Sequence, residues 1–170
     1  TALGETDSAQ GWRENKANGG LLMEVNSNTI LCKGLSMPHS PRWHNNSLWL
    51  EESGHGSLAK VDLNTGQVET VAFFPGFTRG LDFYSNLAFV GLSQVRETAI
   101  FSGLPLTEQL QERSCGIWIV NLSTGKTLAH LKFETGVQEI FAVQVLPGIH
   151  FPEVLPEGEQ YVATSYVLPD

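Results

Sequence analysis

Charged residues are scarce in this sequence, and basic residues are scarcer than acidic ones. The 170 residues include 10 Lys and Arg against 18 Asp and Glu, which gives a net charge of −8, and no basic run occurs. A nucleic-acid-binding protein needs a basic surface to displace the counterions of the phosphate backbone. We therefore expect no nucleic-acid partner.

Long apolar runs and clustered cysteines are also missing. No stretch approaches the roughly 20 apolar residues of a membrane-spanning helix, so no membrane partner is expected. The two cysteines, Cys32 and Cys115, lie far apart and form no Cys/His cluster. This pattern is typical of buried, reduced thiols, and it predicts a cytoplasmic protein.

Helical signals are confined to one short stretch. Between Pro105 and Arg113 the sequence predicts a short helical turn, with Thr107 as its cap. The 17 Gly and 8 Pro of the whole chain indicate many turns between short strands. Trp43, Trp49 and Trp118 lie in strand-like surroundings and are expected in the core. The composition predicts an all-β fold.

Two segments of the chain repeat a hairpin pattern. Val61 to Gln67 (VDLNTGQ) reads like Val120 to Lys126 (VNLSTGK), and a second apolar strand follows each of them. The glycine supplies the positive φ that a tight turn between strands requires. The similarity continues downstream, where Pro75 to Phe83 aligns with Thr135 to Val143.

A fainter third copy lies upstream, where Met37 to Trp43 aligns with Phe77 to Phe83 at an offset of 40 residues. Repeats of about 40 residues that hold four short strands have the spacing of β-propeller blades. The longer interval before the last copy is explained by an insertion over residues 94–114.

The sequence therefore predicts a single propeller-like domain over residues 1–170. It would hold about three consecutive four-stranded antiparallel blades, at residues 17–55, 56–93 and 115–168, and Glu159 to Val167 would form the last strand. Propellers typically have about 4–8 blades, so this is a partial propeller. We expect the remaining blades to come from a missing N-terminal part or from another copy.

Several motifs also resemble a known family: uncharacterised, conserved hypothetical bacterial proteins with propeller-like repeats, which form a domain of unknown function. The stretches that carry the resemblance are TALGETD from Thr1, GLSMPHSPRWH from Gly34, PGFTRGL from Pro75 and FSGLPL from Phe101. The resemblance implies that the chain corresponds to the C-terminal part of the family domain. One departure is Phe141-Ala142, where the family pattern has a Tyr-Asp pair.

The repeat alignment places three ionisable residues at one equivalent position, just before the strands expected to carry Trp43, Phe83 and Val143. These residues are His39, Arg79 and Glu139. In a propeller, that position lies at the mouth of the central channel. The three side chains could line one polar pocket there, or each could satisfy loop backbone groups, with Arg79 paired to Glu139.

The predicted ligand-binding residues are His39, Arg42, His44, Arg79, Asp82 and Glu139. The favoured function is a non-catalytic binding or scaffold module that takes a small-molecule or protein ligand and needs no cofactor. The alternative is a metal-assisted hydrolase of the lactonase kind, which would use calcium or zinc held by His39, Asp82 and Glu139. No residue spacing in the chain matches a common metal motif, so whether the protein is an enzyme stays open.

Overall fold

A computed structural model of the chain describes residues 1–94, 102–152, 158 and 160. Within these ranges antiparallel sheets dominate, which confirms the predicted all-β class. One sheet has two strands, β1-β2, and two sheets have four strands each, in the orders β3-β4-β5-β6 and β7-β8-β9-β10. The strands are β1 (Gly20–Glu24), β2 (Thr29–Leu35), β3 (Pro38–His44), β4 (Ser47–Glu52), β5 (Ser57–Val61), β6 (Val68–Phe73), β7 (Phe77–Tyr84), β8 (Leu87–Ser93), β9 (Gly116–Asn121) and β10 (Thr127–Lys132).

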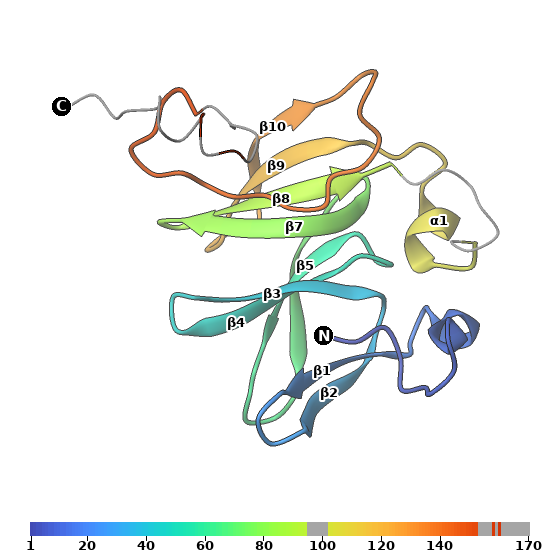
Figure 1. Cartoon of the computed structure of the whole chain (residues 1–170). Helices are drawn as coiled ribbons and strands as arrows, with labels where there is room; N and C mark the ends of the chain where they lie inside the picture. The colour runs from blue at the N-terminus through green and yellow to red at the C-terminus, as the bar shows by residue number, and fades with distance from the viewer. Residues whose placement is uncertain (95–101, 153–157, 159, 161–170) are drawn as a thin grey trace.

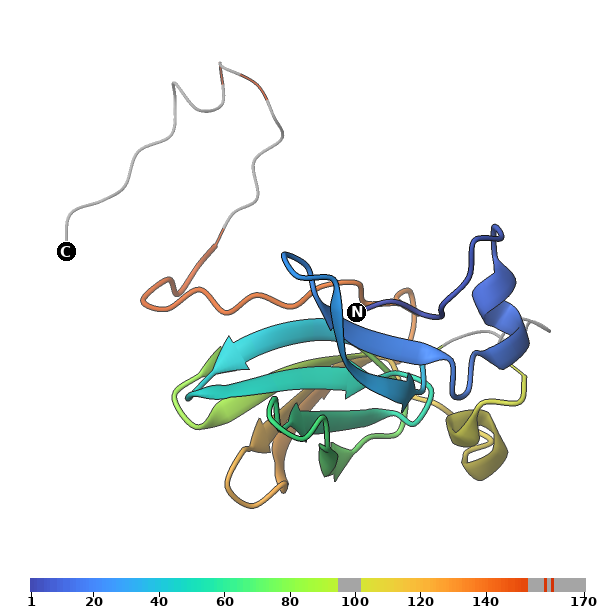
Figure 2. The same cartoon turned by 90° about the horizontal axis from the view of Figure 1, so that it is seen from below.

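The three sheets are stacked, with the β3–β6 sheet in the middle (Figure 1). One core lies between the two four-stranded sheets, where Trp49 and Leu58 pack with Leu81, Val90 and Trp118. A second core lies between the β1–β2 hairpin and the opposite face of the middle sheet. Figure 2 shows this hairpin lying across the middle sheet. Both faces of the middle sheet therefore bury apolar side chains, as in a stack of layers.

The repeated hairpin motifs form equivalent turns. Asp62 Oδ1 accepts hydrogen bonds from the N–H groups of Asn64 and Thr65, at 2.8 and 3.3 Å. Asn121 Oδ1 accepts in the same way from Ser123 and Thr124 at the turn between β9 and β10. The Asp or Asn side chain holds the turn, which confirms the two predicted hairpins.

The four-stranded sheets do not follow the predicted blade boundaries. The boundary between residues 55 and 56 falls inside the middle sheet, because β4 pairs with β5 through five consecutive residue pairs. Each predicted blade begins at the hairpin that joins the third and fourth strands of a four-stranded sheet, such as β5–β6. In the structure, however, the tight turn at Gly54-His55-Gly56 joins β4 to β5 within one sheet. The sheets accordingly span residues 38–73 and 77–132.

A small cluster of helical turns lies at one side of the stack of sheets (Figure 1). Leu104 and Leu106 of the α1 region (Pro105–Gln109) pack with Met37, Phe77 and Trp12, the last from the 3-10 helix η1 (Gly11–Asn15). Thr107 is not the N-cap of α1, because Leu104 holds that position. The Thr107 hydroxyl instead donates to the Leu104 carbonyl oxygen at 2.7 Å. No helix in the described ranges combines the length and apolar character needed to cross a membrane.

Three further predictions concern single residues or strands. Trp49 and Trp118 are buried, but Trp43 is 60% exposed, so its expected place in the core is wrong. Cys32 and Cys115 are both buried and free. The predicted strand Glu159 to Val167, apart from residue 160, and part of the predicted insertion, residues 95–101, lie outside the described residues.

Candidate ligand-binding site

A cavity of about 270 Å³ opens where strands β3 and β7 begin. Three ionisable side chains line it: His39, Arg79 and Glu139. The rest of the lining is Leu3, Trp12, Met37, Ser53, Phe77 and Ser93. The structure thus brings together the three residues that the repeat alignment places at one equivalent position.

Matching irregularities in β3 and β7 position His39 and Arg79. The pairing of β3 with β4 shifts register between His39 and Arg42, and that of β7 with β8 shifts between Thr78 and Leu81. Ser40 and Gly80 lie inside these bulges, and both have left-handed backbones, with φ of 49° and 90°. A β-bulge locally bends its strand and redirects the neighbouring side chains. Both strands therefore turn at the edge of the cavity.

Glu139 reaches the cavity differently, from an extended segment that we call the strap (residues 138–145). No strand occurs among the described residues after β10, so Val143 does not lie in the expected strand. The strap is held against β7 and β8 by hydrogen bonds. Gln94 N–H donates to Gln138 O at 2.7 Å, and the Ser93 hydroxyl both accepts from Ile140 N–H at 2.9 Å and donates to Ile140 O at 3.1 Å.

The far end of the strap is anchored by Asp82. Its Oδ2 accepts hydrogen bonds from Val145 N–H at 2.7 Å and from Gln144 Nε2 at 2.8 Å. Asp82 is absent from the cavity lining, although the sequence predicts it as a ligand-binding residue. In the structure its carboxylate fixes the segment that carries Glu139.

The charges around the cavity are unequal. Burial lowers the pKa of His39 to about 4, and the positive charges of Arg79 and of the chain's amino terminus add to this effect. At neutral pH its imidazole is therefore uncharged. The Arg79 guanidinium lies 4.3 Å from the ring centroid of Phe141 on the strap, a cation–π contact. The cavity thus offers a neutral imidazole, one cation and the exposed Glu139 carboxylate.

A second acidic residue, Glu51, lies next to this site and is absent from the predicted ligand-binding set. It pairs with His39 across β3 and β4, and its side chain is fully buried. Neither carboxylate oxygen has a hydrogen-bond partner among the described residues. Burial raises its pKa to about 8, although the nearby Ser40 hydroxyl, the Gly80 N–H and the charges of Arg42 and Arg79 act in the opposite direction. The signal that could have found Glu51 is the β3–β4 register, which sequence alone does not give.

The remaining predicted residues lie away from the cavity. Arg42 is exposed, and its Nη1 donates to the Pro41 carbonyl oxygen at 3.2 Å. The His44 ring stacks on Phe83, with ring centroids 4.4 Å apart and planes 2° from parallel. His44 Nε2 also bonds to the Ser85 carbonyl oxygen at 2.8 Å. His44 therefore joins the two four-stranded sheets.

The ligands expected for a metal site do not converge. Across the described ranges no group of three or more His, Cys, Asp and Glu side chains is arranged to hold a metal ion. Of the three ligands that the alternative hypothesis requires, His39 and Glu139 line the cavity, whereas Asp82 binds the strap. The observed set can recognise a small polar or anionic group through Arg79 and apolar surface through Trp12 and Phe77.

Two of the solved structures that resemble this chain are computationally designed proteins. The computationally designed Ika8 protein is 16% identical with a TM-score of 0.44, and the match covers 70% of this chain and 31% of that one. The computationally designed Ika4 protein is 15% identical with a TM-score of 0.45, over 73% of this chain and 66% of that one. The chain thus spans about a third of the Ika8 protein.

No curated protein matches the chain. One family model does, over residues 1–155. This match covers the N-terminal part of the chain and does not support the expected correspondence to the C-terminal part of a family domain. The chain belongs to the family described as a domain of unknown function, DUF4915.

Proposed function

We propose that this domain is a propeller-like binding module that holds a small ligand in the cavity between His39, Arg79 and Glu139. The observation that carries the proposal is their common position, since three ionisable side chains from one repeat position line one cavity. A volume of about 270 Å³ is close to the lower end of the usual range for ligand pockets, so the ligand is small.

The propeller-like arrangement is supported by the internal similarity of the sheets. The β3–β6 and β7–β10 sheets have the same strand order, and their first strands bulge at equivalent residues, Ser40 and Gly80. The strap lies against β7, as β7 lies against β3, which supports a third repeat unit at this position. Two free cysteines, Cys32 and Cys115, support a reducing compartment such as the cytoplasm.

The lining favours a ligand with an anionic group and an apolar body. Arg79 supplies the cation for a carboxylate or phosphate group. Trp12, Met37 and Phe77 supply the apolar wall, and the uncharged His39 adds no competing charge. Glu139 also lines the cavity, but it is exposed, so solvent and salt screen its repulsion of an anion. We therefore expect the module to prefer small organic acids over amines and alcohols of the same shape.

Matched probes test this preference. Hexanoate, hexanol and hexylamine share one chain length and differ only in the head group, and their binding can be compared by NMR titration. We expect hexanoate to bind best and the Arg79→Gln variant to lose this advantage. Arg42→Gln is the control, because Arg42 is an exposed arginine outside the cavity lining. Equal binding of the three probes, or equal effects of the two variants, would contradict the proposal.

A further inference from the structure

Two serines, Ser53 and Ser93, line the cavity at equivalent positions of the repeat. Ser53 comes directly after β4, and Ser93 ends β8. Ser53 N–H donates to the Met37 carbonyl oxygen at 3.1 Å, and Ser93 is paired with Phe77 of β7. Met37 and Phe77 are themselves equivalent in the repeat, so the two serines hold the same place in successive layers. Each serine is only 4% exposed.

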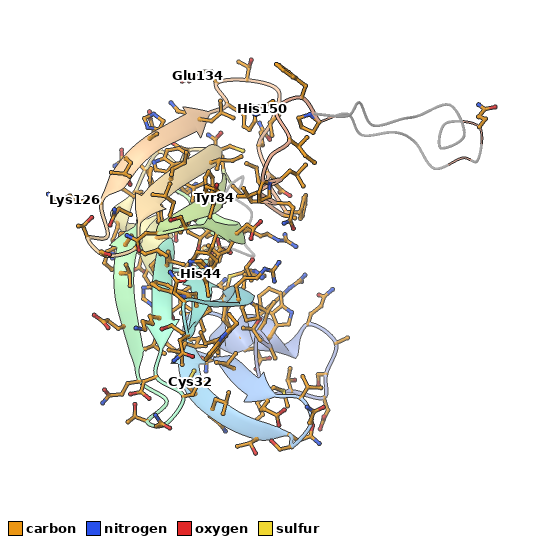
Figure 3. All side chains as sticks on the ribbon, turned by 90° about the vertical axis from the view of Figure 1, so that its left-hand side faces the viewer. Cys32, His44, Tyr84, Lys126, Glu134 and His150 are labelled. Carbon is orange, nitrogen blue, oxygen red and sulfur yellow. The ribbon has the colours of Figure 1, made fainter. Side chains whose placement is uncertain are left out.

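Ser93 shows what a hydroxyl in this place can hold. Its hydroxyl accepts a hydrogen bond from Ile140 N–H at 2.9 Å and donates one to Ile140 O at 3.1 Å. Ile140 belongs to the strap, and the labelled residues on either side of the strap, Glu134 and His150, lie on the side of β7 away from the β1–β2 hairpin (Figure 3). Ser93 therefore binds the N–H and the carbonyl oxygen of one amino-acid residue from the neighbouring layer.

The Ser53 hydroxyl makes no equivalent bonds. In the repeat alignment Gly80 is the counterpart of Ile140, but the Gly80 N–H donates to Ser40 Oγ instead, at 3.1 Å. Within the part of the chain that the structure describes, the Ser53 hydroxyl has no hydrogen-bond partner. A buried hydroxyl without a partner is costly in free energy, and a ligand in the cavity can supply the missing bonds.

We propose that the Ser53 hydroxyl binds the amide N–H and a carboxylate oxygen of an N-acylated amino acid, whose carboxylate also pairs with Arg79. This inference rests on the proposed binding function and names the class of small organic acid. In such a ligand the N–H, the Cα atom and the carboxylate are connected like the N–H, Cα and carbonyl group of Ile140. One serine hydroxyl can donate one bond and accept another, as Ser93 does.

The rest of the cavity suits such a ligand. The Arg79 guanidinium can form charge-assisted hydrogen bonds with the carboxylate. Trp12 and Phe77 can contact an apolar amino-acid side chain. The volume of about 270 Å³ suits a ligand the size of one residue. A free N-acyl amino acid and the C-terminal residue of a peptide share this chemistry.

An ester analogue tests the hydrogen bond in the native protein. N-acetyl-L-leucine and O-acetyl-L-leucic acid have the same shape and the same carboxylate, but the second compound has an ester oxygen in place of the amide N–H. We expect N-acetyl-L-leucine to bind about fivefold more tightly in NMR titrations, as the loss of one hydrogen bond predicts. Equal binding of the two compounds to the native chain would overturn the proposal.

A serine variant tests the assignment to Ser53. Ser53→Ala should abolish the preference for the amide over the ester, because it removes the acceptor of the N–H bond. Ser57→Ala is the matched control: Ser57 is also buried and its hydroxyl has no partner among the described residues, but Ser57 is absent from the cavity lining. The control should keep the native preference. A Ser53→Ala variant that keeps it as well would contradict the assignment.

Two further probes complete the test. An acetylated tripeptide that ends in leucine should bind more tightly than N-acetyl-L-leucine if the natural ligand is the end of a peptide, and more weakly if it is a free N-acyl amino acid. Hexanoate has no amide group, so its advantage over hexanol can persist when the amide and the ester bind equally. Loss of the hexanoate advantage would instead contradict the proposed function itself.

Discussion

The Ser40 hydroxyl accepts a hydrogen bond from the Gly80 N–H at 3.1 Å, and these two residues occupy equivalent positions in strands β3 and β7. Both have left-handed backbones, which Ser adopts only at a cost in conformational energy. The bond ties the two bulges together beside the cavity. Because one bond joins both repeats, changes at either residue should affect His39 and Arg79 together.

Gly80→Ala should detach the strap. A Cβ at this position would lie 2.8 Å from the Cα and carbonyl carbon of Ala142 and 2.9 Å from the Val143 nitrogen, closer than packed atoms tolerate. We expect a loss in unfolding free energy clearly above the roughly 1–2 kcal/mol of a left-handed alanine, measured by urea unfolding. Gly136→Ala is the control, because its φ of 83° is similar but no atom lies within 4 Å. Equal losses in the two variants would show that the contact with the strap is unimportant.

Asp82→Ala should release the strap without disturbing the sheets. The substitution removes the acceptor of the Val145 and Gln144 hydrogen bonds. Hydrogen exchange of residues 138–145 should then speed up, while exchange within the β3–β6 sheet stays unchanged. Asp62→Ala removes an aspartate that bonds only within its own turn and should leave the strap protected. Unchanged exchange at residues 138–145 in Asp82→Ala would contradict this role.

Glu51 should make the protein less stable as the pH rises from about 4.5 to about 8. Its pKa is about 8 in the folded chain and about 4.5 when unfolded, so in this window the folded state holds a proton that the unfolded state has lost. The contribution of Glu51 to stability therefore falls by about 1.4 kcal/mol per pH unit. Between about pH 4.5 and 6.5 the opposite contribution of His39 offsets this fall, so the slope of the native protein is clearest between pH 6.5 and 8. Glu51→Gln, which cannot ionise, should abolish this slope in urea unfolding series.

The control for that series is Glu69→Gln, since Glu69 is an exposed glutamate on β6. It should keep the native slope. A Glu51→Gln profile that runs parallel to the native profile would show that Glu51 already ionises near its ordinary pKa.

His39 should produce a slope of the opposite sign at lower pH. Its pKa is about 4 in the folded chain and 6.5 when unfolded, so the unfolded state binds more protons between these values. Stability from this group is present above pH 6.5 and is lost as the pH falls towards 4. His39→Phe should remove the loss, whereas His130→Phe, at an exposed position on β10, should not. Urea unfolding series at several pH values can measure the native chain and both variants.

The sequence predicts part of this structure because its signals are local or periodic. The hairpins at Asp62 and Asn121 depend on side chains that bond to nearby backbone, so their turns can be read from a few residues. The repeat register placed His39, Arg79 and Glu139 together for a similar reason. Residues at one position of a repeat share one neighbourhood whenever the repeats stack.

The rest depends on contacts between distant segments. Sheet boundaries could not be predicted, since the β4–β5 turn and the β5–β6 turn look equally sharp in sequence. Asp82 is predicted as a binding residue because nothing in the sequence indicates its hydrogen bond to Val145, which lies 63 residues away. The sequence does not show that Glu51 lies in the core, since only the β3–β4 register places it there.

The strap forms part of the cavity wall through Glu139, so the cavity depends on the docking of the strap. Glu139 reaches the cavity only while residues 138–145 stay docked on β7, and a handful of hydrogen bonds hold them there. A ligand that touches Glu139 binds only the docked population, so its apparent affinity is reduced by the undocked fraction. Substitutions far from the cavity that shift this docking equilibrium would then change how tightly the module holds its ligand, with every direct contact unaltered.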